Sequence, residues 1–260
     1  MDLGLKGKSA IICASSRGLG KACAFSLASN GVNVVLNGRN KEVLEETASY
    51  ISKSFSDIEV DIVSSDVSTD EGREALLEVC PAPDILINNN GGPPFKDFRD
   101  LDKESIMDGL NMNMITPIEL IQKIIDGMIE KKFGRIVNIT SISVKKPMFG
   151  LDLSSGARAG LTAFLSGVAR SVAQHNVTIN NILPGMFDTD RLRQSLDAKS
   201  KMTNESINKI SDQMTSSVPA KRFGNPSEFG EACAFLCGEQ AGYITGQNLL
   251  LDGGLYESSF

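Results

Sequence analysis

Several residue types that mark other classes of protein are scarce in this chain. A single histidine, His175, excludes a metal centre built on histidines. The five cysteines include no Cys-x-x-Cys pair, the spacing typical of zinc and redox sites. Cys233 and Cys237 lie four residues apart in a stretch with helical character, but two thiols alone make a poor zinc site. We therefore expect reduced, structural cysteines and no metal.

Long hydrophobic runs and basic blocks are also absent. No apolar run approaches the ~20 residues that a membrane span needs, and residues 1–8 lack the apolar core of a signal peptide. The net charge of −6 and the pI of about 5.0 argue against a nucleic-acid partner. We expect a cytoplasmic protein that binds small molecules rather than nucleic acid or a membrane.

The chain of 260 residues alternates short apolar runs with amphipathic stretches. The runs predict strands at 9–14, 33–37, 58–64, 84–88, 135–139, 177–183 and 248–251. The stretches between them predict helices at 19–30, 41–54, 70–79, 103–132 and 157–174. Apolar strands separated by helices indicate a parallel sheet that is covered on both faces. We expect an α/β fold in a single domain, residues 1–260: a doubly wound (Rossmann) seven-stranded parallel sheet.

Residues 186–217 depart from this alternation, because they are polar and carry only a thin apolar stripe. The stripe comprises Leu192, Leu196, Met202, Ile207 and Ile210. The segment follows the carboxyl end of a strand, which is the edge where doubly wound sheets bind ligands. We expect a lid-like helical excursion here. The alternative is a solvated surface excursion with no role in binding.

The first predicted strand runs directly into a glycine-containing turn, Cys13-Ala-Ser-Ser-Arg-Gly-Leu-Gly20, that opens the first helix. Gly18 and Gly20 allow the backbone to turn tightly and to approach a ligand closely. The free N–H groups of the new helix favour an anion such as a pyrophosphate. In this context the loop predicts a dinucleotide site. The alternative is a tight turn that binds nothing.

The second predicted strand ends in Asn37-Gly-Arg-Asn40, without the acid that usually binds the ribose of NAD. Arg39 and Arg17 offer cations that can bind a 2′-phosphate. NADP is therefore favoured as the cofactor over NAD. The alternative is that Arg39 is a solvated surface residue.

Further motifs follow in order along the chain. They are Asp66-Val67, Asn88-Asn-Asn-Gly91, Asn113, Asn138-Ile-Thr-Ser141, Pro184-Gly185 with Thr189, and Tyr243 to Gly254. Together with the glycine loop they resemble the motifs of the short-chain dehydrogenase/reductase family over essentially the whole chain. The resemblance is closest to its 3-oxoacyl-carrier-protein reductases. It implies hydride transfer to or from a carbonyl or alcohol, with a 3-oxoacyl-like substrate as one candidate.

The resemblance also implies which residues surround the cofactor. Including the two arginines, the residues expected to bind NADP are Ser15, Arg17, Gly18, Leu19, Gly20, Arg39, Asp66, Val67, Asn89, Gly91, Pro184, Gly185 and Thr189. In the family, the helix expected at 157–174 packs against its copy in a tetramer. Its small residues (Ala159, Gly160, Ala163 and Gly167) lie beside apolar ones, so we expect a homotetramer. The alternative is that this stripe packs within one monomer.

Two departures from the family pattern affect the chemistry. The family's Tyr-x-x-x-Lys should begin thirteen residues after Ser141, where this chain has Ser154 and, four residues later, Arg158. None of the three tyrosines is an obvious substitute. The phosphate loop begins Cys13-Ala14 where the family has Thr-Gly. A serine is a far weaker acid than a tyrosine, and an arginine does not relay protons readily.

The candidate catalytic residues are therefore Ser141, Asn113, Ser154 and Arg158. Ser141 is expected to orient a carbonyl, and water or one of Lys145, Lys146 and Asp152 is expected to supply the proton. The structural alternative makes Ser154 a helix N-cap and Arg158 a surface cation. Met148, Phe149, Leu151, Leu153, Met186 and Phe187 predict an apolar wall beside the site.

Two functions follow from these residues. The first is an atypical NADP-dependent oxidoreductase with weak or unusual catalysis. The second is an inactive nucleotide-binding sensor or scaffold of the same fold. The cofactor motifs favour the first, and the missing tyrosine favours the second.

Overall fold

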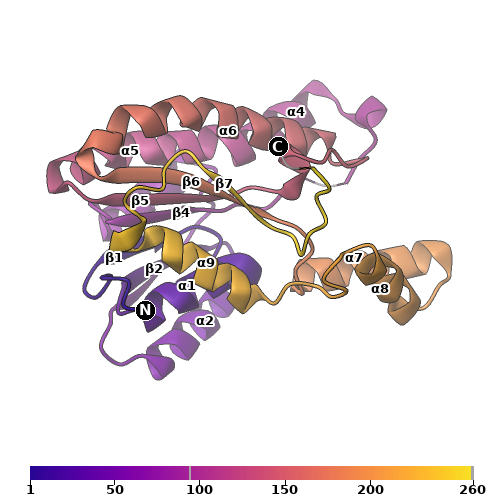
Figure 1. Ribbon diagram of the computed structural model, residues 1–260, viewed down its shortest axis with the longest axis horizontal. Helices are drawn as coiled ribbons and strands as arrows, with labels where there is room; N and C mark the ends of the chain where they lie inside the picture. The colour runs from indigo at the N-terminus through magenta and orange to yellow at the C-terminus, as the bar shows by residue number, and fades with distance from the viewer. Residues whose placement is uncertain (94, 259–260) are drawn as a thin grey trace.

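The computed structural model describes residues 1–93 and 95–258, and a parallel seven-stranded sheet forms its centre (Figure 1). The strands are β1 (Ser9–Ile12), β2 (Asn33–Gly38), β3 (Val60–Ser64), β4 (Ile85–Asn88), β5 (Gly134–Ile139), β6 (Val177–Pro184) and β7 (Asn248–Leu251). Their order is β3-β2-β1-β4-β5-β6-β7, and all neighbours run parallel. The direction of winding reverses between β1 and β4, where ligands bind in such sheets. The predicted doubly wound fold is confirmed.

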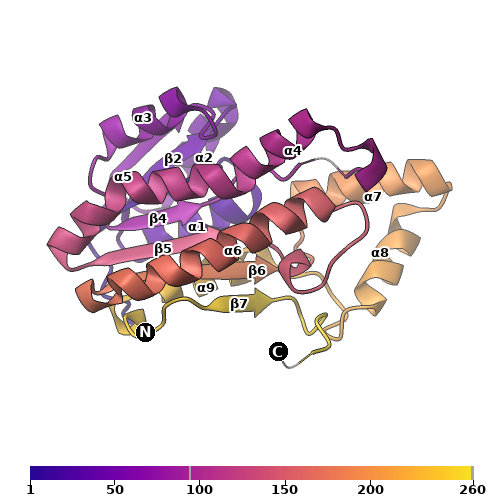
Figure 2. The same ribbon diagram turned by 90° about the horizontal axis from the view of Figure 1, so that it is seen from above.

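Helices cover both faces of the sheet, as Figures 1 and 2 show. One face carries α1 (Gly18–Ser29), α2 (Lys41–Ser54) and α9 (Pro226–Cys237). The other carries α3 (Asp70–Val79), α4 (Lys103–Leu110), α5 (Thr116–Lys131) and α6 (Asp152–Val172). Each face buries its own apolar cluster against the strands, which explains why the strand sequences are apolar runs rather than alternating patterns.

Two helix predictions need correction. The single helix expected at 103–132 is divided into α4 and α5 by a π-helical turn, η2 (Asn111–Ile115). The helix expected at 157–174 begins at Asp152 instead. Gly156 lies inside this longer helix α6, and Leu153 in its first turn packs against Gly109 of α4. This tertiary contact, which a local pattern does not reveal, extends the helix.

A chain of four asparagines joins the strands β4 to β7. Asn88 Nδ2 donates to Asn138 Oδ1 over 2.9 Å, and Asn138 Nδ2 donates to Asn181 Oδ1 over 2.9 Å. Asn181 Nδ2 then donates to Asn248 Oδ1 over 2.8 Å. These residues are register partners on adjacent strands. Asn88, Asn138 and Asn181 are buried, and buried amide pairs fix the register and so position the loops that follow β4 and β5.

The excursion at 186–217 forms two helices, α7 (Asp190–Thr203) and α8 (Ile207–Ser216), which extend away from the sheet (Figures 1 and 2). They pack mainly against each other. Leu196 and Ile210 of the predicted apolar stripe are buried, but Met202 is 86 % exposed.

All five cysteines are buried and unpaired. None of the helices in the described part of the chain is long and apolar enough to cross a membrane.

Candidate functional site

The loops that follow β1, β4, β5 and β6, together with the start of α1, carry most of the predicted site residues, and they meet at the carboxyl edge of the sheet. Arg39, Asp66 and Val67 follow β2 and β3 instead. The phosphate loop follows β1, Asn89 and Gly91 follow β4, and Ser141 follows β5. Pro184 ends β6, and Gly185 and Thr189 come after it. Parallel strands expose the amide and side-chain groups of all these loops at one edge, which creates the site.

The phosphate loop is held tightly against β1 and β2. Ser15 is fully buried, and its hydroxyl donates to Ile12 O over 2.8 Å and accepts from Asn37 N over 3.0 Å. A Cβ on Gly20 would lie 2.4 Å from the carbonyl oxygen of Ala14, so only glycine fits there. Ala14 itself has a φ of 46°, a left-handed conformation that is unfavourable for alanine. The loop therefore adopts the tight turn even with Ala14 in place of glycine.

The start of α1 suits a phosphate group. Its N-cap residue, Arg17, makes no side-chain capping bond, so the N–H groups of the first turn have no cap partner. Gly18 has a φ of 57°, and a Cβ there would lie 3.6 Å from Thr189 Cγ2. Thr189 caps α7, because its hydroxyl accepts from Leu192 N. The phosphate loop and the base of α7 thus adjoin each other at the start of α1, where a pyrophosphate is expected.

Two exposed arginines lie near the positions expected for the adenosine end. Arg39 is 78 % exposed and lies 3.8 Å from Asp66, while Arg17 is 58 % exposed and lies 3.9 Å from Asp190. Ion pairs as long and exposed as these are weak, so both cations can turn towards a phosphate. Burial alone would raise the pKa of Asp66, but hydrogen bonds from Ser68 and the charge of Arg39 lower it. The Asp66 carboxylate is therefore charged at neutral pH.

The remaining predicted cofactor residues shape the backbone of the site. Asn89 Nδ2 donates to Ala14 O over 3.2 Å and ties the β4 loop to the phosphate loop. A Cβ on Gly185 would lie 2.8 Å from Asp252 Cα, so the β6 loop is packed against the segment after β7. Gly91 is exposed, with nothing within 4 Å of where its Cβ would be. Val67 is buried in the apolar cluster of one face of the sheet, and Leu19 packs partly buried against the cluster of the other face.

Asn113 and Ser141 both have hydrogen-bonding capacity that the described residues do not use. Asn113 lies in the π-helical turn and is buried, and its Oδ1 accepts no hydrogen bond from the described residues. The Ser141 hydroxyl accepts from Ser143 N over 3.1 Å, but no described residue accepts its hydrogen. The helix α6 packs against the elements that carry both residues.

Arg158 and Ser154 are not the surface residues of the structural alternative. Ser154 lies inside α6, whose N-cap is Leu151, so it is not an N-cap. Arg158 is only 8 % exposed, and its Nη1 donates to Ile139 O over 2.6 Å. Its Nε donates to Ser154 Oγ over 3.2 Å. The two residues form a hydrogen-bonded pair that is fixed to Ile139, the last residue of β5, two positions before Ser141.

The Arg158 guanidinium has no carboxylate partner among the described residues. Burial, and to a lesser extent the charge of Arg191, lower the pKa of Arg158 to about 10, so it remains charged at neutral pH. The sequence gives no reason to single out Arg191, which simply follows the Thr189 motif by two residues. A buried cation without a counter-ion is costly, and it marks a place where negative charge is expected to arrive.

Several expected neighbours of the site have other roles. Lys146 Nζ donates to Leu255 O over 3.2 Å, and Lys145 lies over the ring of Tyr256. Neither contact singles out a proton donor. Phe187 does not belong to the predicted apolar wall, because it is buried against Phe229 with ring centroids 5.5 Å apart.

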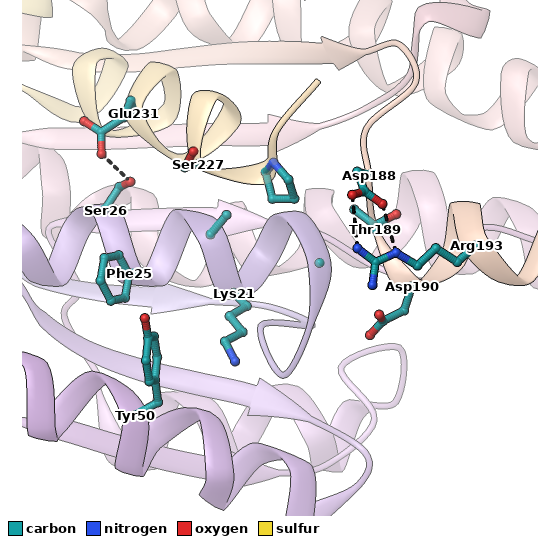
Figure 3. A pocket seen from close by; sticks show the side chains of 13 residues that line it. Lys21, Phe25, Ser26, Tyr50, Asp188, Thr189, Asp190, Arg193, Ser227 and Glu231 are labelled. Atoms are coloured by element: carbon teal, nitrogen blue, oxygen red, sulfur yellow. Dashed lines mark hydrogen bonds and ion pairs between the residues drawn. The ribbon is translucent and has the colours of Figure 1, made fainter. Parts of the chain in front are cut away.

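A pocket of about 380 Å³ lies between α1, α9 and the start of α7 (Figure 3). Gly18 and Thr189 border it, and Lys21, Tyr50 and Arg193 also line it. None of the four predicted catalytic residues lines this pocket. It therefore adjoins the phosphate loop from outside and is separate from the residues expected to act on a substrate.

The chain is similar to known reductases along nearly its full length. It is 30% identical over 255 residues to the NADPH-dependent reductase BacG of Bacillus subtilis, covering 96% of this chain and 98% of that protein. It is 31% identical to the 3-oxoacyl-(acyl-carrier-protein) reductase FabG of Aquifex aeolicus, covering 98% of this chain and 100% of that protein. The L-sorbose reductase of Gluconobacter frateurii, solved with NADPH and L-sorbose, superposes with a TM-score of 0.94 at 28% identity, covering 99% of this chain and 100% of that one.

A family model described as enoyl-(acyl carrier protein) reductase matches residues 13–256. The match begins in the phosphate loop and ends after the last strand, so it includes every motif described above. The protein therefore belongs to this family, within the short-chain dehydrogenases/reductases that its motifs resemble.

Proposed function

We propose that the protein is an NADPH-dependent reductase of carbonyl compounds in which Arg158, held by Ser154, takes over from the usual tyrosine and lysine. The names of its relatives confirm the predictions of an oxidoreductase and of NADP as the cofactor. The observation that carries the proposal is the buried, charged Arg158, which binds the last residue of β5, two positions before Ser141 in the chain. A cation in that place can bind the ribose hydroxyls of the cofactor or stabilise the negative charge that develops on a carbonyl oxygen, and we propose the second role.

The residues at the carboxyl edge of the sheet fit the cofactor. The uncapped start of α1 and the glycine turn would hold the pyrophosphate, and Thr189 would close over it from the base of α7. Arg17 and Arg39 would bind the 2′-phosphate, beside Asp66 and Val67 at the adenine. Asn89, Gly91, Pro184 and Gly185 would line the remaining length of the cofactor.

When bound, NADPH supplies a hydride for the carbonyl carbon. The chain's own residues act on the carbonyl oxygen: Ser141 donates a hydrogen bond, and Arg158 stabilises the negative charge that develops. Ser154 is a positioning residue, since its oxygen fixes the Arg158 guanidinium. An arginine does not release a proton readily, so water protonates the alkoxide. Asn113 lies in the π-helical turn beside α6, and its Oδ1, which accepts no hydrogen bond from the described residues, would accept one from that water.

Calorimetric titration with NADPH, followed by a panel of ketones, 3-oxoacyl thioesters and oxo acids, tests this proposal. We expect NADPH binding and substrate-dependent NADPH oxidation. Tight NADPH binding without oxidation by any member of the panel would favour the nucleotide-binding sensor or scaffold instead.

Arg39→Ala is expected to weaken NADPH binding by about tenfold or more and to leave NADH binding nearly unchanged. A charge-assisted contact with the 2′-phosphate contributes about 1.5–3 kcal/mol, and only NADPH carries that phosphate. The exposed pair with Asp66 costs little to break. Calorimetry with both cofactors measures the difference. Equal losses for NADPH and NADH would refute the assignment of Arg39.

In this proposal the chain forms a single domain, and the helices α7 and α8 act as a lid over the site. They extend from the β6 loop, and they make few contacts with the rest of the structure. Few contacts leave such an element free to close over a substrate. Five unpaired cysteines also fit the reducing cytoplasm, where we place the protein.

A homotetramer is expected, with α6 at one interface. Among the apolar residues of this helix, Leu161 and Leu165 are buried within the monomer and are therefore not available for an interface. Phe164 is 48 % exposed beside the exposed small residues Ala163 and Gly167, and an apolar strip of this kind suits packing against its own copy. Light scattering at micromolar concentration measures the mass. A monomeric mass would contradict this expectation.

A further inference from the structure

Arg191 extends from α7 over the loop that follows β4. Its two terminal nitrogens lie 2.8 and 2.9 Å from the position that a Cβ on Gly92 would occupy. Gly92 directly follows the motif that ends at Gly91, so the guanidinium lies across the mouth of the site. Its positive charge also contributes to the lowered pKa of Arg158. Arg191 therefore joins the base of the lid to the reaction site.

No carboxylate of the described residues forms an ion pair with Arg191. The two nearest acids in sequence have other cations beside them: Asp188 binds Arg193 over 2.9 Å, and Asp190 faces Arg17. The guanidinium lies directly over Gly92, in space that a side chain at that position would share with it. Two arginines thus face one site, and neither has a counter-ion among the residues that the structure describes.

The two cations differ in where they lie. Arg158 is buried and fixed by Ile139 and Ser154, which suits the charge that develops on one reacting oxygen. Arg191 is exposed at the mouth and has both terminal nitrogens available, which suits a permanent anion on the part of the substrate that lies outside. A neutral ketone or a thioester would leave Arg191 with nothing to bind.

We propose that Arg191 binds a carboxylate of the substrate, so that the protein reduces oxo acids in preference to neutral ketones. This inference rests on the proposed reductase function. Guanidinium groups bind carboxylates through two parallel hydrogen bonds, which fix the orientation of the substrate as well as its affinity. A guanidinium could bind a phosphate of the cofactor in the same way, and the experiments below distinguish a substrate carboxylate from a cofactor phosphate.

The kinetic experiment compares 2-, 3- and 4-oxo acids with their methyl esters as substrates. For wild type we expect kcat/KM to be at least about tenfold higher for the best acid than for its ester. Arg191→Gln should raise KM for the acid by about 10- to 100-fold and leave the ester unchanged. Lys201→Gln removes a positive charge from the same helix, where Lys201 pairs with Asp197, and serves as the matched control. It should change neither substrate's KM.

Calorimetry provides a measurement that does not depend on turnover. Oxamate, an unreactive carboxylate, is titrated into the NADP⁺ complex of wild type and of Arg191→Gln. We expect binding to wild type and a loss of at least about tenfold in the variant, with NADPH affinity unchanged. If NADPH is never oxidised but oxamate binding depends on Arg191, the reductase function fails and the carboxylate site stands.

Two results would overturn the carboxylate site. Acids and esters that are reduced equally well, with oxamate binding indifferent to Arg191→Gln, would show that no substrate anion is recognised there. A variant that loses NADPH affinity by tenfold or more while the preference for acids persists would assign Arg191 to a cofactor phosphate.

Discussion

Arg158→Gln is expected to lower kcat for carbonyl reduction by ~10²–10³-fold, the usual effect of removing a group that stabilises charge in the transition state. Glutamine keeps one hydrogen-bond donor towards Ile139 but removes the positive charge. Arg158→Lys keeps the charge but replaces the planar fork, whose Nη1 and Nε bond Ile139 O and Ser154 Oγ, by a single ammonium, so an intermediate loss is expected. Stopped-flow oxidation of bound NADPH by the best oxo acid measures the chemical step.

Arg170→Gln is the matched control, because Arg170 is exposed near the far end of the same helix. It should retain the wild-type kcat. NADPH titrations and thermal unfolding of each variant show whether the cofactor site and the fold persist. A kcat for Arg158→Gln equal to that of wild type, with NADPH still bound, would show that this guanidinium has no part in the reaction.

Gly20→Ala is expected to weaken NADPH binding by about 100-fold or more, which corresponds to about 2.7 kcal/mol. The new Cβ would lie 2.4 Å from the Ala14 carbonyl oxygen and 2.9 Å from Asn89 Nδ2. The Ala14 oxygen belongs to the backbone, so the collision is relieved only by opening the phosphate loop. Calorimetry and the fluorescence of bound NADPH measure the loss.

Gly127→Ala is the control for this change, since nothing lies within 4 Å of a Cβ at that position of α5. It should leave NADPH affinity unchanged and add slightly to stability through the better helix propensity of alanine. If Gly20→Ala bound NADPH as tightly as wild type, the cofactor would not lie against this loop.

The fold could be predicted from the sequence because each strand is a run of buried apolar residues between amphipathic helices. Such runs require helices on both faces, and that requirement leaves few topologies. The start of α6 could not be predicted, because it depends on Leu153 packing against Gly109, far away in the sequence.

The candidate site was only partly predictable for the same reason. Arg158 could be matched to the family's lysine by counting from Ser141. Its burial depends on which face of α6 meets the end of β5, and a local pattern fits a surface cation equally well. Arg191 had no signal at all, because its neighbour Gly92 lies far from it in the sequence and is brought close only by the fold.

Deuterium transfer from NADPH that carries deuterium at both positions of the nicotinamide C4 tests the central claim most directly. The wild-type protein, the labelled cofactor and the best oxo acid are combined, and mass spectrometry follows the product alcohol. If the account is correct, one deuterium appears on the former carbonyl carbon with wild type, and the rate falls with Arg158→Gln. Bound NADPH that transfers no label to any carbonyl compound, under conditions where calorimetry shows the cofactor site to be filled, would contradict it.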